Sequence, residues 1–253
     1  MEKVIDVKGL YVSIDDNEIL SDVSFSAFRG EATVILGGSG SGKTTLLRRL
    51  LGLHPVDKGY ISVLGEDISG LSETEMNELY HKMGVFYQNG ALLASQTVGE
   101  NVAMPLLHQS NLPRSLIKDI VKMKLGLVNL KEAYELYPAQ LSGGMLKRVA
   151  LARAIAMDPP LLFCDEPGAG LDPVSLESLD NLILNLKDQL GISIVLITHE
   201  VSSILRVADR IVFLDKGTVI YEGSIKEGLS SEIREIEDFF SILRTVHAQE
   251  MKN

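Results

Sequence analysis

The stretch TVILGGSGSGKTTLLRRLL, residues 33–51, decides the fold. Its first four residues form an apolar run that predicts a strand buried on both faces, and leucines at helical spacing begin at Leu46. The six residues between them, 37–42, are all glycine or serine. The order strand, glycine-rich loop, helix predicts an α/β protein with a phosphate-binding loop.

The loop follows the pattern Gly37-x-x-x-x-Gly42-Lys43-Thr44, and each residue type has a chemical reason. Glycines let the backbone curl so that successive N–H groups point at phosphate oxygens, and the helix start adds the positive end of its dipole. Lys43 supplies a mobile charge for β- and γ-phosphates, and Thr44 supplies a hydroxyl for Mg²⁺. The alternative, an ordinary turn, is disfavoured by the lysine and by the flanking strand and helix. The predicted nucleotide-binding residues here are Gly37, Gly38, Ser39, Gly40, Ser41, Gly42, Lys43, Thr44 and Thr45.

The composition is typical of a folded protein. Because the net charge is negative, any bound anion must be held by a local site. The chain has 253 residues, 45% hydrophobic and 23% charged, enough for one large α/β domain or two small ones. Its net charge of −10 provides no overall positive field for DNA or anionic lipid. The single cysteine, Cys164, excludes a disulfide scaffold and fits a reducing cytosol. We expect no signal peptide and no apolar stretch of about 20 residues, so the chain would serve a membrane only as a soluble partner.

Periodicity predicts the other elements. Apolar residues alternate through residues 4–28, which indicates antiparallel strands, and residues 89–157 favour helices broken by Pro105, Pro113 and Pro138. Apolar runs on either side of a helical stretch predict a parallel β-α-β unit. The further predicted elements are strands Tyr60–Leu64, Leu161–Cys164 and Ile192–Ile197, helices Leu71–Met83, Leu176–Leu190 and Ile225–Glu250, and a hairpin of Ile211–Leu214 with Thr218–Tyr221.

These elements predict three regions. Residues 1–88 and 158–225 would form a nucleotide-binding core with an antiparallel β subdomain, residues 89–157 an inserted helical subdomain, and residues 226–253 a helical tail. We expect the tail to pack on its own domain, the alternatives being a partner copy or an accessory subunit. Its apolar residues at helical spacing are Ile233, Ile236, Phe239, Phe240, Ile242, Leu243 and Val246.

Two carboxylates, Asp165 and Glu166, follow the apolar run at 161–164. Ligands gather at the carboxyl ends of strands in open α/β sheets. We assign Asp165 to the magnesium shell, and Glu166 to orienting and deprotonating the attacking water. Alone, such a pair is more often a solvated feature of a loop, and the phosphate-binding loop reverses that preference.

A third segment, Leu141-Ser142-Gly143-Gly144-Met145, places a serine and two glycines at a helix start. It resembles the signature motif of ATP-binding cassette (ABC) ATPases. The phosphate-binding loop, Gln88, the acidic pair, Gly170-Leu171-Asp172-Pro173 and Thr198-His199 fall in that family's order. The resemblance implies a P-loop NTPase (RecA-like) fold: a mixed sheet core with an N-terminal antiparallel β subdomain and an inserted α-helical subdomain.

The resemblance also implies roles for these residues. Two cassettes would close head to tail, so that each ATP is bound by residues 37–44 of one chain and covered by residues 141–145 of its partner. Asp172 would couple the two sites across that interface. The implied catalytic residues are Glu166, His199, Gln88 and Lys43, with His199 touching the γ-phosphate. The implied ligands of Mg²⁺ are Thr44, Gln88 and Asp165.

Two positions depart from the family pattern. Ile14 stands where many cassettes stack an aromatic ring on adenine, and Tyr11 lies three residues earlier. Apolar contact alone discriminates less among bases than an oriented ring, so we expect Ile14 to contact ATP with weaker selection. Met145 replaces the glutamine of many importers. The other histidines, such as His54, have no motif around them and are interpreted as ordinary surface residues.

Two segments resemble a subfamily. Residues 87–106 and residues 141–153 are similar to the Mla-type cassettes that work with MCE-domain lipid-binding proteins. This implies transport of phospholipids, or of related lipids, between envelope membranes, by a cassette at the cytoplasmic face of the inner membrane. The implied partners are a second copy of the chain, a membrane permease, an MCE-domain protein and a small accessory subunit, with no nucleic acid. The alternatives are a polar-solute importer, for example for amino acids, and a non-transport ATPase scaffold.

The segment after Gln88 is where the resemblance places contact with the permease. We expect Ala91, Leu92, Leu93 and Ala94 to offer a small apolar groove, with Glu100 and Asn101 at its rim. The alternative is that these residues belong to the core of the helical subdomain.

Overall fold

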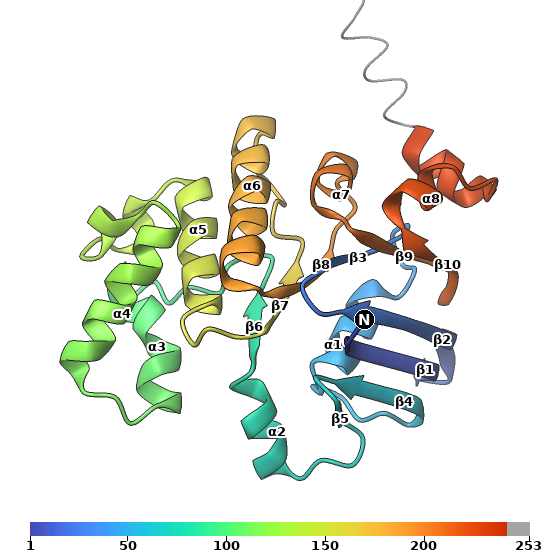
Figure 1. Ribbon diagram of the computed structural model, residues 1–253, viewed down its shortest axis with the longest axis horizontal. Coiled ribbons are helices and arrows are strands. Elements are labelled where there is room, and N and C mark those ends of the chain that lie inside the picture. Colours follow the sequence, from blue (N-terminus) through green and yellow to red (C-terminus); the bar gives the residue numbers. More distant parts are fainter. Residues whose placement is uncertain (242–253) are drawn as a thin grey trace, which may run out of the picture. The chain divides into compact units, whose positions relative to one another are not determined.

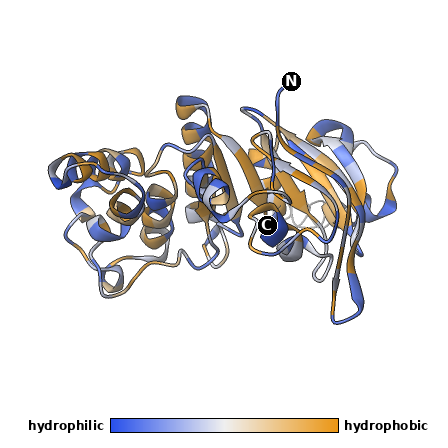
Figure 2. Cartoon of the chain, turned by 90° about the horizontal axis from the view of Figure 1, so that it is seen from below, coloured by the Kyte–Doolittle hydropathy of each residue, from blue (hydrophilic) through white to orange (hydrophobic). Residues whose placement is uncertain are grey.

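The computed structural model describes residues 1–241 and has an α/β fold (Figure 1). It divides into two compact units. Unit 1 contains Met1–Leu71 and the chain from Ile197 onward, and unit 2 contains Ser72–Leu196. Each unit is described by itself below. Apolar residues are concentrated on the strands, while the helices carry both polar and apolar residues (Figure 2).

The first sheet of unit 1 is antiparallel, as the alternating pattern predicts. It has the order β2-β1-β4-β5, formed by β1 (Lys3–Ile14), β2 (Asn17–Phe28), β4 (Lys58–Val63) and β5 (Glu66–Asp67). Ile14 pairs with Asn17, so Asp15 and Asp16 alone make the turn, both with positive φ. Such two-residue turns match the twist of paired strands.

The remaining strands of unit 1 are β3 (Ala32–Leu36), β9 (Arg210–Asp215) and β10 (Thr218–Ser224). β3 pairs with β9 in parallel, and β9 and β10 form the predicted antiparallel hairpin. Every residue of β3 is buried, which agrees with its uninterrupted apolar run. The helices are α1 (Lys43–Leu50), which follows the glycine loop, and α7 (Val201–Val207).

The tail differs from the single helix predicted for Ile225–Glu250. α8 (Ile225–Leu229) ends early, and a second helical stretch covers residues 234–241. Ser230 and Ser231 lie between them, and serine competes with helical hydrogen bonding through its own side chain. Ile242, Leu243, Val246 and the rest of the predicted helix lie outside the described residues.

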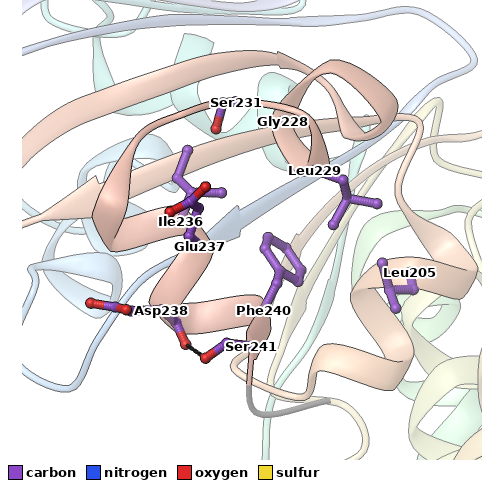
Figure 3. A pocket seen from close by; sticks show the side chains of 9 residues that line it. All are labelled: Leu205, Gly228, Leu229, Ser231, Ile236, Glu237, Asp238, Phe240 and Ser241. Atoms are coloured by element: carbon purple, nitrogen blue, oxygen red, sulfur yellow. Dashed lines mark hydrogen bonds between the residues drawn. The ribbon is translucent and has the colours of Figure 1, made fainter. Parts of the chain in front are cut away.

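The described part of the tail packs on its own unit, as expected. Ile236 is 1% exposed, and the Phe239 ring meets the Phe213 ring edge to face at 5.4 Å. In Figure 3, Phe240, Leu229 and Leu205 face a shared cavity of about 510 Å³. Apolar contact with β9 therefore holds residues 234–241 on this unit.

The strands of unit 2 are β6 (Met83–Phe86), β7 (Leu161–Asp165) and β8 (Ser193–Ile197), whose last residue lies at the unit boundary. β7 lies between β8 and β6, and β6 runs parallel to it with Met83 opposite Leu161. The sequence prediction was wrong at Met83, which was assigned to the end of a helix. That helix, α2 (Glu73–Tyr80), ends three residues earlier.

The helical part of unit 2 agrees with the predicted helical region. It contains α3 (Val98–Gln109), α4 (Arg114–Leu127), the short 3-10 helices Lys131–Ala133 and Pro138–Gln140, and α5 (Gly143–Ala154). α6 (Pro173–Leu190) follows β7. Pro105 does not break α3, contrary to the prediction, because one internal proline removes a single backbone hydrogen bond without ending the helix here. Pro113 and Pro138 do stand at helix starts.

Within residues 1–241, no helix combines the length and the apolar composition that crossing a bilayer requires. The predicted α/β class, with an antiparallel sheet and a largely parallel one, is what the structure has.

Candidate functional site

The glycine loop of unit 1 joins β3 to α1, as predicted, and two of its glycines are sterically required. A Cβ on Gly37 would lie 2.0 Å from the Leu214 carbonyl oxygen of β9, and one on Gly42 would lie 2.5 Å from Leu20 Cδ2. Both residues have positive φ, +148° and +102°. Only glycine adopts these angles at such close approach.

Lys43 lies over the loop that it follows. Its Nζ donates hydrogen bonds to the carbonyl oxygens of Gly37 (2.9 Å) and Gly38 (2.8 Å). The buried Ser41 accepts a hydrogen bond at its backbone oxygen from the Gly217 N–H in the β9–β10 turn, at 3.2 Å. These hydrogen bonds hold the loop against the rest of unit 1, while Gly38, Ser39, Gly40 and Thr44 are exposed.

The start of α1 has the features of an anion site. Gly42 occupies its N-cap in the left-handed conformation, and no side chain caps the helix. The backbone N–H groups of the first turn therefore face the loop together with the Lys43 ammonium. A phosphate group fits this combination of dipole and charge.

Ile14 lies near helix α1, which follows this loop. With Ser13, Thr45, Arg48, Arg49 and His54 it lines a cavity of about 370 Å³. The Ile14 side chain is 48% exposed, whereas the Tyr11 ring has the Lys58 ammonium 3.6 Å from its centre. Arg48 and His54 are neighbours of this cavity that sequence reasoning missed, since no local pattern marks them.

His199 also belongs to unit 1 and is exposed just after β8. The preceding Thr198 is buried, and its Oγ1 accepts a hydrogen bond from the Glu200 N–H at 3.0 Å. That bond fixes the turn between β8 and α7, so it sets where the His199 backbone leaves the strand.

The acidic pair lies in unit 2 at the carboxyl end of β7, as predicted. Asp165 is the last residue of the strand, and Glu166 follows with φ of +45°. A glutamate in the left-handed region is uncommon, and such residues cluster at functional sites. Both side chains are half-buried.

The residues assigned to Mg²⁺ suit that ion chemically. Thr44, Gln88 and Asp165 offer oxygen ligands, which Mg²⁺ prefers, and it takes its other ligands from phosphates and water. Among residues 1–241 there is no cluster of three or more His, Cys, Asp or Glu side chains arranged to hold a metal.

The signature segment begins α5, which we call the signature helix. Ser142 is its N-cap, and the Ser142 Oγ accepts a hydrogen bond from the Met145 N–H at 3.3 Å. Ser142 and Gly143 are exposed, while Leu141, Gly144 and Met145 are half-buried. The exposed helix start has the same dipole character as the start of α1.

Asp172 is the N-cap residue of its own helix, α6. Its Oδ1 accepts hydrogen bonds from the N–H groups of Val174 (3.1 Å) and Ser175 (3.0 Å), and its Oδ2 accepts one from the Ser175 hydroxyl (2.5 Å). The Ser175 hydroxyl bond, followed by its backbone bond, lowers the pKa of the Asp172 carboxyl. Asp172 therefore carries a negative charge at neutral pH, and the residue is exposed.

Gln88 is exposed after β6 and begins the loop 88–97 that leads to α3. In this loop Ala91, Leu93 and Ala94 are exposed and Leu92 is half-buried, so the apolar segment lies on the surface and not in the core. Asn101 is not at its rim, contrary to expectation. The Asn101 side chain is buried and bonds the loop backbone, while Glu100 forms a capping box with Thr97.

The predicted site residues thus fall into one group in each unit. Unit 1 holds residues 37–45 together with Ile14, and it also holds His199. Unit 2 holds Gln88, the acidic pair, Asp172 and the signature residues 141–145.

A buried strand, a glycine loop in which Gly37 and Gly42 have no room for a Cβ, and a lysine over an uncapped helix start define a P-loop nucleotide-binding protein. A family model described as "ABC transporter" matches residues 20–169, and this chain belongs to the ABC transporter family. Proteins of this family bind and hydrolyse ATP, and their cassettes dimerise and work with a permease.

Curated relatives point to transport of different substrates. The chain is 38% identical to the "intermembrane phospholipid transport system ATP-binding protein MlaF" of Haemophilus influenzae, over 94% of this chain and 90% of that protein. It is 37% identical to the "methionine import ATP-binding protein MetN" of Mannheimia succiniciproducens, over 95% of this chain and 68% of that protein.

Solved structures agree on the fold. The chain is similar to cbiO1 of Clostridium perfringens, part of the ABC transporter complex cbiONQ, with a TM-score of 0.85 and 28% identity over 99% of this chain and all of that one. It is also similar to the cassette MJ0796, seen as a dimer in a post-hydrolysis state bound to ADP and Pi. There the TM-score is 0.78, with 27% identity over 87% of this chain and 98% of that one. The RecA-like fold expected from the sequence is thereby confirmed.

Proposed function

We propose that this chain is the Mg²⁺-dependent ATP-hydrolysing subunit of an ABC transporter that moves lipid, most simply phospholipid, between membranes of the cell envelope. The observation that carries the lipid assignment is the likeness to MlaF, a phospholipid transport protein, over 94% of this chain and 90% of that one. The geometry of the glycine loop supports the ATPase part independently.

Each catalytic residue has a role in this proposal. Lys43 binds the β- and γ-phosphates, and Glu166 orients and deprotonates the attacking water. Gln88 contacts that water, and His199 contacts the γ-phosphate. Thr44, Asp165 and Gln88 would hold Mg²⁺ together with the nucleotide, and the ion would supply positive charge beside the phosphates. Phosphoryl transfer depends mainly on such positioning and charge neutralisation.

Two copies would close on ATP. Residues 37–45 and Ile14 of one copy bind the nucleotide, and residues 141–145 of the other cover it with the exposed start of the signature helix. ATP then joins two anion-binding helix starts, and hydrolysis removes that link. The charged, exposed Asp172 faces the partner in this arrangement. The dimeric state of MJ0796 with ADP and Pi supports it.

The functional division of the chain follows the same roles. Residues 1–88 and 158–225 form the nucleotide-binding core with its β subdomain, residues 89–157 form the helical subdomain with the signature, and residues 226–253 form the tail. The exposed segment 91–94 then receives the permease. The complex includes an MCE-domain protein and a small accessory subunit, and the cassette sits at the cytoplasmic face of the inner membrane.

A polar-solute importer is the second candidate, favoured by the 37% identity to MetN, a methionine import protein. It uses the same catalytic residues, so the ATPase chemistry does not discriminate. A non-transport ATPase scaffold is the third candidate and would have no permease.

Affinity purification of the tagged chain from native membranes separates these candidates. Mass spectrometry of co-purifying proteins and lipids should find a permease, an MCE-domain protein and phospholipid. The matched control is Lys43→Ala, which should retain the membrane partners while losing ATP turnover. A permease with a solute-binding protein would replace the lipid assignment by the importer, and the absence of any membrane partner would support the scaffold.

A further inference from the structure

The loop 88–97 is held almost wholly through its backbone, by side chains from two helices. Lys147 and Arg153 come from the signature helix α5, and Asn101 comes from α3. Figure 1 shows α3, α4 and α5 grouped together. The residues that hold the loop belong to one compact unit, so their contacts form a single connected set.

Lys147 holds the first residue of the loop. Its Nζ donates a hydrogen bond to the Gln88 carbonyl oxygen and lies 6.0 Å from the centre of the Phe86 ring. Lys147 is half-buried, and the resulting loss of hydration lowers the pKa of its ammonium. A partly desolvated cation depends strongly on the acceptor that remains to it.

Arg153 holds the next two residues. Its two terminal nitrogens donate hydrogen bonds to the carbonyl oxygens of Gly90 (2.6 Å) and Ala91 (2.7 Å). Both residues have positive φ, +69° and +48°, a conformation in which one guanidinium reaches both carbonyls. A Cβ on Gly90 would lie 3.2 Å from Ala150 Cβ, so the loop lies directly against the signature helix. Lysine cannot reproduce this planar two-point contact.

Asn101 holds the far end of the loop to α3. The buried amide accepts from the Leu93 N–H (2.7 Å) and donates to the carbonyl oxygens of Leu93 (3.1 Å), Gln96 (3.2 Å) and Thr97 (2.9 Å). Residues 88–91 are thus attached to α5 and residues 93–97 to α3. Relative motion of the two helices would therefore act on Leu92, which lies between these attachments, and on its exposed neighbours Ala91 and Leu93.

We propose that Lys147 and Arg153 are positioning residues that join loop 88–91 to the signature helix, so that displacement of Ser142 at the helix start is transmitted to the exposed segment 91–94. A 12-residue helix is a rod of about 18 Å, and both residues grip backbone atoms that cannot rotate away. The inference rests on the proposed function, in which Ser142 covers ATP and segment 91–94 meets the permease. Lys147 further fixes the backbone that carries Gln88.

The test uses the full chain and a single introduced thiol. Burial raises the pKa of the Cys164 thiol and leaves it unreactive, so Ala94→Cys can be labelled alone with an environment-sensitive fluorophore. In a Glu166→Gln background, Mg-ATP is added, and probe fluorescence is recorded beside dimer formation by size-exclusion chromatography. The variants are Lys147→Met and Arg153→Met. The control is Ser178→Ala, which removes a different contact of α5, the 2.8 Å bond from Arg148.

We expect Lys147→Met and Arg153→Met to dimerise on ATP but to lose about nine-tenths of the probe response, because the mechanical link is gone. With Glu166 restored and the native residue at position 94, Lys147→Met should lower kcat about tenfold and leave KM for ATP within about twofold, since the glycine loop is untouched. Lys147→Arg should recover most of both signals, and Ser178→Ala should change neither.

A dimer whose probe response and kcat stay within about twofold of the parent in both methionine variants would overturn this proposal alone. A parent protein that does not dimerise on ATP would overturn the proposed function, and this proposal with it. Should the methionine variants fail to fold, Arg153→Lys carries the test. It keeps the charge with one donor nitrogen in place of two, and it should give an intermediate response, whereas a full response would contradict the link.

Discussion

Replacement of single glycines in loop 37–42 by alanine should destabilise the protein to very different extents. The Gly38 position is open, with no atom within 4 Å of an added Cβ and no positive φ. Gly40 is equally open but has φ of +75°. At Gly37 the φ is +148° and the added Cβ would lie 2.0 Å from the Leu214 carbonyl oxygen. Comparison of these three positions therefore separates the effect of backbone conformation on stability from the effect of a steric clash.

The free energies of unfolding follow from these differences. Gly38→Ala should be neutral or stabilising by about 0.5 kcal/mol, because it restricts only the unfolded chain. Gly40→Ala should cost about 1 kcal/mol. The alanine pays the penalty of a left-handed backbone conformation, and the restriction of the unfolded chain offsets part of it. Gly37→Ala should cost about 3–5 kcal/mol. The backbone strain of a positive φ adds to the collision of the new Cβ with the Leu214 carbonyl oxygen, and only a shift of the end of β9 relieves that collision.

Urea unfolding without nucleotide measures all three, with the m-value as a check that the same transition is compared. Binding of a fluorescent ATP analogue to Gly37→Ala should fall in parallel. If Gly37→Ala lost no more than about 1 kcal/mol relative to Gly38→Ala, the close approach of β9 to the loop would not limit this position.

Three further outcomes are expected. Glu166→Gln should form an ATP-bound dimer on size-exclusion chromatography and slow phosphate release about 10²–10⁴-fold, since the water loses its base; a monomer, or normal turnover, would contradict the assigned role. Ile14→Tyr should lower the Kd for ATP about 2–10-fold and sharpen selection against pyrimidine triphosphates, since a ring can then stack on the base. Equal Kd values would show that position 14 does not contact the base. Lys124 is 1% exposed and forms an ion pair with Asp158. Asp158→Ala should therefore lower the free energy of unfolding by about 2–3 kcal/mol, because it leaves a buried ammonium without this partner. Lys124→Met removes the charge and keeps the volume, so it should cost about 1 kcal/mol or less, and equal losses in urea unfolding would refute this account.

The fold and the glycine loop could be predicted because their signals are local. Residues 33–51 carry strand, loop and helix in one uninterrupted stretch, and the glycines mark positions that the backbone geometry requires. The acidic pair could be placed because it follows a buried run, and the pattern predicted the start of β7 correctly and its end one residue early.

Features decided by tertiary contact were missed. β6 has only four residues, Met83–Phe86, and becomes a strand by pairing with β7. Asn101 reads as a polar helix residue, and only the folded loop shows that its amide is buried. Contacts between side chains and distant backbone, such as that from Arg153 to Gly90, leave no periodic signal in the sequence.

The backbone attachment of loop 88–97 has a consequence for how such a protein can diversify. Because Lys147, Arg153 and Asn101 bind main-chain atoms, these contacts do not depend on the side chains that the loop displays at 93 and 94. Under the proposed function, the backbone contacts that respond to nucleotide and the side chains that meet the permease are therefore encoded by different residues. A designer could then adapt this cassette to a foreign permease by exchanging a few exposed side chains, without changing the residues that bind and hydrolyse ATP.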